Sequence, residues 1–168
     1  NLFRYERPQR GRLREHWQLN CDMFGIDAIA ADVEMIALAY NVLTSFGATP
    51  DDFVIKINHR RLRSDWLEDQ YGITDESVIA QISRILDKKN KVIEAEIKGL
   101  LEPIVQENYE KFRKELDLDV NSFVQLLNSE RQHSSIIKIV KSLNELGISN
   151  IVFDASLSRG FDYYTGTI

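Results

Sequence analysis

The chain has 168 residues, 43% of them apolar, and a formal net charge of −5. This length and composition are enough for one sizeable core, so we expect a globular chain with room for a small insertion. No apolar run approaches the roughly 18 residues that cross a bilayer, and no signal-peptide pattern is present, so we expect a cytoplasmic protein without a membrane partner. The three histidines and the single Cys21 form no metal-ligand spacing, and Cys21 alone cannot form an internal disulfide.

The first predicted element is an antiparallel hairpin. Residues 2 to 6 alternate between polar and apolar side chains, and residues 14 to 24 do so over a longer span. The turn-rich residues 8 to 11 connect the two strands. The polar face of this hairpin would bring a cation, carboxylates and amides together: Arg4, Glu6, Gln18, Asn20 and Asp22. An ordinary solvent-facing sheet surface is the alternative interpretation of this face.

Next come a helix, a strand and a second helix. Residues 32 to 46 have apolar side chains at helical spacing, with Asp32 as the predicted N-cap and Gly47 as the predicted stop. This helix should pack on a sheet. Residues 53 to 59 alternate as a strand, and the sequence after them is helical up to Gly72.

From residue 73 to residue 127 the sequence becomes charged and helix-forming, with an interruption at Pro103, which predicts an inserted helical subdomain. Residues 132 to 146 form another amphipathic helix that ends at Gly147, and the strand NIVFD follows. We therefore predict an α+β fold: an antiparallel sheet with flanking helices and a helical insertion. The insertion (73–127) divides the chain into a first part (1–72) and a second part (128–168).

Positive charge is concentrated at the start of the chain. Residues 1 to 16 hold five arginines against Glu6 and Glu15, a net charge of +3, which leaves −8 for the remainder. A solvated loop is the simplest explanation. However, arginine occurs there without lysine, and guanidinium groups pair bidentately with phosphates and with base edges. The pattern favours a loop that binds phosphates.

Two motifs resemble the histidyl-tRNA synthetase family. FRYERPQRGRLREHWQ (3–18) resembles motif 2 of the class II aminoacyl-tRNA synthetases in its histidyl form, and LSRGFDYYTG (157–166) resembles the second histidine signature. ADVEMIALA and FVIKINHR fit the stretch that follows motif 2. The resemblance covers most of the chain and is weaker over residues 73 to 127. It implies that residues 1–72 and 128–168 are two parts of the catalytic core of a class II synthetase. Ser158 and Phe161 replace commoner aliphatic residues, and Asp22 stands where some members have glutamate.

The resemblance implies activation of L-histidine by ATP with Mg²⁺, followed by transfer to histidine tRNA. Arg4 and Arg159 would be catalytic, and each would contact the α-phosphate and the bound histidine. Glu6 would accept a hydrogen bond from the adenine amine. Arg12 would hold the phosphate tail or the acceptor end of the tRNA. Catalysis of histidine activation depends on positioning the two reactants and on stabilising the charge of the transition state.

The resemblance also implies a histidine pocket and a tRNA contact. Asp22 and Tyr164 would bind the imidazole nitrogens, Gln18 would orient the amino acid, and Tyr163 would line the pocket. A Tyr-Tyr pair elsewhere would more often belong to a core strand. The residues expected to meet the acceptor stem are Arg7, Gln9 and Arg10.

Two other functions remain open for such a sequence. One is a synthetase-like regulatory subunit of histidine biosynthesis that does not aminoacylate, and the other is a tRNA-sensing binding domain. The complete motif 2 loop argues against the first, and the intact adenylation residues argue against both. The chain lacks an initial methionine and ends in an alternating run, so we expect it to belong to a longer protein. The resemblance implies that this longer protein is a homodimer and that it is needed for activity.

Overall fold

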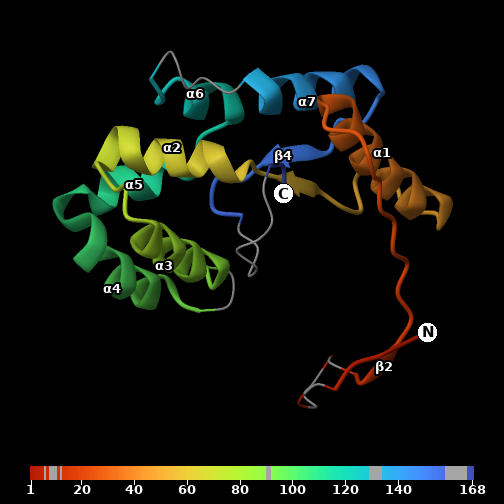
Figure 1. Ribbon diagram of the computed structural model, residues 1–168, viewed down its shortest axis with the longest axis horizontal. Coiled ribbons are helices and arrows are strands. Elements are labelled where there is room, and N and C mark those ends of the chain that lie inside the picture. Colours follow the sequence, from red (N-terminus) through yellow and green to blue (C-terminus); the bar gives the residue numbers. More distant parts are fainter. Residues whose placement is uncertain (6, 8–10, 12, 90–91, 129–133, 158–165) are drawn as a thin grey trace.

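The structure is a computed structural model. It describes the whole chain except residues 6, 8–10, 12, 90–91, 129–133 and 158–165 (Figure 1). The strands of the described part are β1 (Leu2–Phe3), β2 (Glu15–His16), β3 (Ile55–Ile57) and β4 (Ile151–Phe153). The helices are α1 (Ile29–Ser45), α2 (Arg60–Tyr71), α3 (Glu76–Asp87), α4 (Glu94–Val105), η1 (Gln106–Asn108), α5 (Tyr109–Glu115), α6 (Val120–Val124) and α7 (Ser134–Glu145).

The described strands form two separate pairs. β1 and β2 are antiparallel, with Leu2 opposite His16, as the hairpin prediction requires. β3 and β4 are parallel, with Ile55 opposite Ile151, which the sequence analysis does not predict. About a hundred residues of mostly helical chain separate β3 from β4. A connection of that length can return the chain to run in the same direction, whereas a short turn cannot.

Strand β2 is much shorter than the alternating run that predicts it. Residues 17 to 23 continue in an extended segment that pairs with no described strand. Ladder hydrogen bonds define a strand, and alternation alone does not supply them. The alternation nevertheless persists, because the side chains of Gln18, Asn20 and Asp22 contact one another on one side of the segment.

Helix α1 begins three residues before the predicted start. Its N-cap is Ala28, which makes no side-chain cap bond, so the prediction that Asp32 is the N-cap is wrong. Asp32 lies instead in the first turn, where its Oδ2 accepts a hydrogen bond from Thr167 Oγ1 at 2.8 Å. The predicted stop at Gly47 is correct: its φ of +93° is a left-handed conformation that glycine adopts without strain.

Helix α4 contains Pro103 and continues past it to Val105. The predicted interruption at Pro103 therefore lies at the residues that follow, where Gln106 has a φ of +52° and the short η1 begins. A proline near the end of a helix removes one backbone donor without ending the helix at once.

One core joins α2 to the helices that follow it. Trp66 of α2 is fully buried, and its ring centroid lies 4.8 Å from that of Phe112 and 5.3 Å from that of Phe123. The same core includes Ile139 of α7 and Ile57 of β3. The aromatic contacts explain why the charged sequence between residues 73 and 127 folds against α2.

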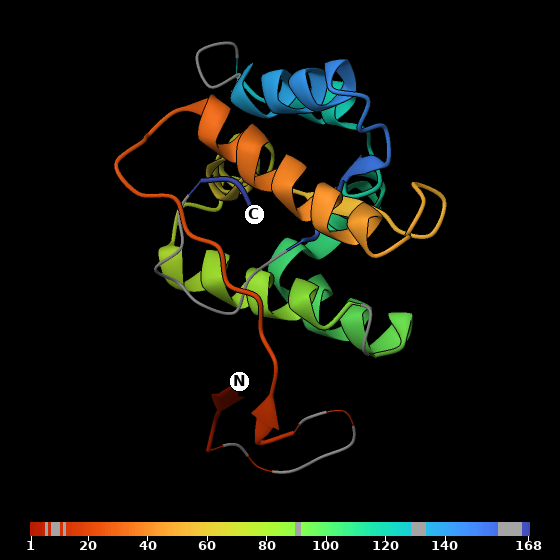
Figure 2. The same ribbon diagram turned by 90° about the vertical axis from the view of Figure 1, so that its right-hand side faces the viewer.

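The hairpin stands apart from the helical body. In Figures 1 and 2 the β1–β2 pair lies at the end of an extended segment, while α1 and α7 lie side by side and the C-terminus lies near β3 and β4. Trp17 of this segment is 86% exposed. Among the described residues, no helix combines the length and apolar character that crossing a membrane would require.

Candidate functional site

A continuous row of polar side chains runs across the hairpin and the segment that follows it. Arg4 Nη2 donates to Gln18 Oε1 at 3.2 Å, and Gln18 Nε2 donates to Asn20 Oδ1 at 3.4 Å. Asn20 Nδ2 then donates to Asp22 Oδ2 at 2.9 Å. We call these four residues the polar row. It presents a guanidinium group at one end and a carboxylate at the other, with amides between them.

Local structure explains why the polar row forms. Successive side chains of an extended chain point to opposite sides, so residues 18, 20 and 22 share one side. The backbone amide of Arg4 donates to Arg14 O at 2.8 Å, which continues the hairpin pairing towards its loop. The Arg14 guanidinium lies 5.2 Å from the centre of the exposed Tyr5 ring, on the edge of the same hairpin.

The second motif is described at its two ends only. The carbonyl oxygen of Leu157 accepts hydrogen bonds from Asn58 Nδ2 at 3.0 Å and from Arg63 Nη1 at 3.2 Å. At the other end, Gly166 O accepts from the backbone amide of Arg60 at 3.0 Å. Both ends of the second motif therefore contact residues 58 to 63, which run from the end of β3 into α2.

A cavity of about 450 Å³ lies where the start of α1 meets the C-terminal segment. Asp32 and Thr167, which are hydrogen-bonded to each other, lie on its wall together with His59. The cavity thus adjoins the end of the second motif. Carboxylate, imidazole and hydroxyl groups give this wall both donors and acceptors.

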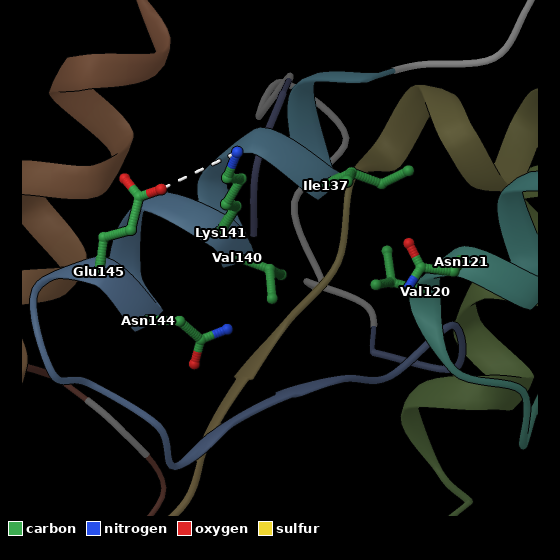
Figure 3. Close-up of a pocket in the computed structure, with 7 residues that line it drawn as sticks. All are labelled: Val120, Asn121, Ile137, Val140, Lys141, Asn144 and Glu145. Atoms are coloured by element: carbon green, nitrogen blue, oxygen red, sulfur yellow. Dashed lines mark ion pairs between the residues drawn. The ribbon is translucent and has the colours of Figure 1, made fainter.

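Another cavity, of about 460 Å³, lies between α6 and α7 (Figure 3). Val120, Ile137 and Val140 give it apolar walls, and Lys141 forms an ion pair with Glu145 at 3.9 Å along its rim. None of the site residues predicted from the sequence lines this cavity. In the described part of the chain, no group of three or more His, Cys, Asp and Glu side chains could hold a metal ion.

The structure describes four of the predicted site residues. Arg4, Gln18 and Asp22 belong to the polar row, and Arg7 is exposed. The others lie outside the described residues: Glu6, Gln9, Arg10, Arg12, Arg159, Tyr163 and Tyr164. The β1–β2 hairpin lies away from the C-terminus in both views (Figures 1 and 2).

Sequence analysis missed two polar residues near the second motif. Asn58 is 1% exposed and Arg63 is 3% exposed, and each donates to Leu157 O. Burial lowers the pKa of the Arg63 guanidinium to about 10, with a further contribution from the charge of Arg60. The signal in the sequence was a polar INHRR stretch directly after an apolar strand, but its alternation and charge resemble those of an ordinary strand end.

Several known proteins are similar to this chain. The crystal structure of histidyl-tRNA synthetase from Nostoc sp. PCC 7120 matches with a TM-score of 0.71 and 25% identity, over 84% of this chain and 36% of that chain. The structure of an ATP phosphoribosyltransferase regulatory subunit/histidyl-tRNA synthetase from Bacillus halodurans has the same fold, with a TM-score of 0.68 and 24% identity over 85% of this chain and 39% of that one. The fold is thus part of the catalytic core of a class II synthetase.

The sequence comparisons define the family. Residues 1–168 match the family model for histidyl-tRNA synthetase. The histidine–tRNA ligase of Leptospira biflexa is 40% identical over the whole of this chain and 39% of its own length, and that of Thermococcus kodakarensis is 31% identical over the whole of this chain and 40% of its own length. The chain therefore belongs to the histidyl-tRNA synthetase family, and it spans about two fifths of the length of these relatives.

Proposed function

We propose that the protein carrying this chain is a histidine–tRNA ligase, which activates L-histidine with ATP and transfers it to histidine tRNA. The observation that carries the proposal is the polar row, because it places a guanidinium group and a carboxylate on one face, joined by amides. Family membership supplies the reaction class. We also propose a cytoplasmic homodimer whose activity needs the longer protein.

The chemical step suits a site built from arginines. A carboxylate oxygen of histidine bonds to the α-phosphorus of ATP, and the bond from that phosphorus to the bridging oxygen breaks. Pyrophosphate leaves with the electron pair. Negative charge increases on the α-phosphate oxygens in the transition state, so a fixed guanidinium group lowers the barrier by electrostatic stabilisation. Arg4 and Arg159 take this role, and Mg²⁺ enters bound to ATP.

Recognition of histidine requires groups that match both imidazole nitrogens. Asp22 accepts a hydrogen bond from one nitrogen, and Tyr164 contacts the other, while Tyr163 lines the pocket. A substrate that left these groups unpaired in a buried site would bind less well, by about 1 to 3 kcal/mol for each unsatisfied group. Gln18, which is hydrogen-bonded to Arg4, orients the amino acid. Glu6 accepts from the adenine amine and Arg12 holds the phosphate tail or the tRNA acceptor end.

The arginine-rich loop contacts the tRNA acceptor stem through Arg7, Gln9 and Arg10. Phosphate contacts from arginines position a nucleic acid and make binding sensitive to salt. Replacing Arg7 and Gln9 together by alanine should impair transfer to tRNA far more than adenylate formation, and should weaken the salt dependence of tRNA binding. Arg84→Ala, an exposed charge on α3, is the control that leaves both unchanged. Equal losses in both half-reactions would contradict the acceptor-stem contact.

A regulatory subunit without ligase activity is the second candidate, because the Bacillus halodurans neighbour bears both descriptions and shares the fold. A fold by itself does not define a function. The arginine-rich sequence of the motif 2 loop favours the ligase, since a subunit that binds neither ATP nor tRNA has no need of it. A tRNA-sensing binding domain would bind tRNA without forming an adenylate.

Exchange of pyrophosphate into ATP tests the proposal in the intact protein. We expect exchange that depends on histidine and that other amino acids do not support. Exchange without preference among amino acids, or none at all, would exclude the ligase. If the intact protein shows no exchange, tRNA binding would identify the sensing domain. Failure to bind either ATP or tRNA would favour the regulatory subunit.

A further inference from the structure

Residues 58 to 63, which run from the end of β3 into α2, contact both ends of the second motif. Leu157 and Gly166 are the first and last residues of LSRGFDYYTG, and the structure describes both of them. Leu157 O accepts from Asn58 and Arg63, and Gly166 O accepts from the Arg60 amide. Residues 58 to 63 therefore form hydrogen bonds with Leu157 and Gly166, which lie nine positions apart in the sequence.

Further hydrogen bonds extend these contacts on each side. Asn58 and Ile168 exchange two backbone bonds, with N–O distances of 3.0 and 2.8 Å. Asn58 Nδ2 also donates to Ala155 O at 3.2 Å, and Asn58 Oδ1 accepts from the His59 amide at 2.8 Å. The buried side-chain amide of Asn58 thus uses both of its donors and its acceptor, which fixes its orientation.

Arg63 is a charged residue that lies buried in α2. It is 3% exposed, and its Nε makes no hydrogen bond with any described residue. The ion pairs among the described residues do not include a carboxylate bound to Arg63. A buried guanidinium group contributes little to stability when, as among the described residues here, no carboxylate offsets the cost of removing it from water. Its bond to Leu157 O therefore points to a role other than holding the core together.

We infer that Asn58 and Arg63 are positioning residues for the histidine signature, acting through Leu157 rather than by touching the substrate. This inference rests on the proposed function, which assigns Arg159 to the α-phosphate. Arg159 lies two residues after Leu157. The reaction depends on the position of positive charge beside the α-phosphate. A displacement of about 1 Å in the residues at the start of the second motif can therefore lower the rate by on the order of a hundredfold.

The variant Arg63→Met distinguishes a role of Arg63 in positioning the histidine signature from a role in folding. Methionine retains most of the apolar contact of arginine and removes a buried charge, so we expect the variant to fold with an unchanged or raised melting temperature. The single-turnover rate constant of adenylate formation should fall at least tenfold, while the KM for ATP changes less than twofold. This rate constant does not depend on the fraction of folded protein. Arg63→Lys keeps one donor in reach and should recover part of the rate.

The matched control is Arg61→Met on the same helix. The Arg61 side chain is 75% exposed and pairs with Asp65 at 4.0 Å, so its loss should leave the rate constant unchanged. Amide hydrogen exchange adds a readout that does not require activity: peptides covering residues 154 to 168 should exchange about tenfold faster in Arg63→Met than in Arg61→Met.

The outcomes separate this inference from the proposed function. A lower rate constant and faster exchange in Arg63→Met alone support the positioning role. An unchanged rate constant, or equal losses in both variants, overturns it while leaving the ligase intact. If the unsubstituted protein forms no histidine adenylate, the proposed function fails and the positioning role fails with it, even if hydrogen exchange changes as expected.

Discussion

Glu115 is a buried carboxylate at the centre of an aromatic cluster. Its Oε2 accepts hydrogen bonds at 2.7 Å from both Trp66 Nε1 and the Tyr71 hydroxyl, and Lys111 lies 3.7 Å from its Oε1. Burial and the hydrogen bond to Glu115 raise the pKa of Tyr71, so its hydroxyl remains a donor at any ordinary pH. Glu115 thus satisfies two ring donors that would otherwise be buried without partners.

Replacing Glu115 by alanine should lower the free energy of unfolding by about 3 kcal/mol, because two donors lose their acceptor in a buried site. Urea denaturation followed by circular dichroism measures the change. The control is Glu110→Ala on the same helix, where the exposed side chain forms an ion pair with Lys98 at 3.5 Å, and we expect almost no loss. Similar losses in the two variants would show that the ring donors find other partners.

Asp22 provides the second prediction at the scale of a single residue. Asp22→Asn should raise the KM for histidine while leaving that for ATP unchanged, since an amide stabilises a donating or protonated imidazole less than a carboxylate does. Pyrophosphate exchange in the intact protein measures both constants. Glu34→Gln, the same acid-to-amide change at an exposed position on α1, is the control. An unaltered KM for histidine in Asp22→Asn would exclude Asp22 from the pocket.

At the scale of elements, a single ion pair ties the parallel strands together. Lys56 of β3 lies 2.8 Å from Asp154, which directly follows β4, and the Asp154 amide donates to Ile57 O at 3.0 Å. Burial raises the pKa of Asp154, but hydrogen bonds from Lys56 and Ser156 more than offset this, so the pKa lies below its ordinary value. The ionised carboxylate therefore stabilises the folded state.

The depressed pKa fixes the direction of the pH dependence. A carboxyl group with a lower pKa in the folded state stabilises it fully above the pKa of the unfolded chain, near 4, and loses this contribution as the pH falls through the folded pKa. Asp154→Asn should thus lower the free energy of unfolding by about 1 kcal/mol at pH 7, and the difference from the unsubstituted chain should shrink as the pH falls below about 4. Melting temperatures across this pH range test it, with the exposed Asp51→Asn as the control. A constant difference down to pH 2 would contradict it.

For the molecule as a whole, the two tryptophans report on its two parts. Trp17 belongs to the segment after the hairpin and is 86% exposed, whereas Trp66 is fully buried in the core. Phe3 and Leu19 of the hairpin region are also exposed, so little apolar burial holds this region against the helical body.

Trp17→Phe should shift the fluorescence maximum of the 168-residue chain to shorter wavelength, because only the buried Trp66 then emits. Quenching by acrylamide should fall several-fold, and the melting temperature should change by less than about 2 °C, since an exposed side chain contributes little to stability. Phe46→Leu, which alters an exposed ring at the end of α1, should change neither property. An unchanged quenching constant in Trp17→Phe would show that the hairpin packs on the body.

Much of the local structure could be predicted from the sequence. The alternation of residues 14 to 24 predicted the shared face of Gln18, Asn20 and Asp22, and glycines 47, 72 and 147 marked the ends of three helices. These features depend on side-chain periodicity and on backbone conformations that each residue allows by itself. The motifs predicted the family for the same reason, since they lie within short continuous stretches.

Contacts between distant residues were decided only by the tertiary structure. The sequence by itself determined the polar row, but not that Asn58 and Arg63 would hold Leu157, more than ninety positions away. Nor did it determine the parallel pairing of β3 with β4, or that Glu115 would accept from Trp66. A buried asparagine and an exposed one look alike in a sequence. Burial and partner are set by which segments the core brings together, and that depends on packing across the whole chain.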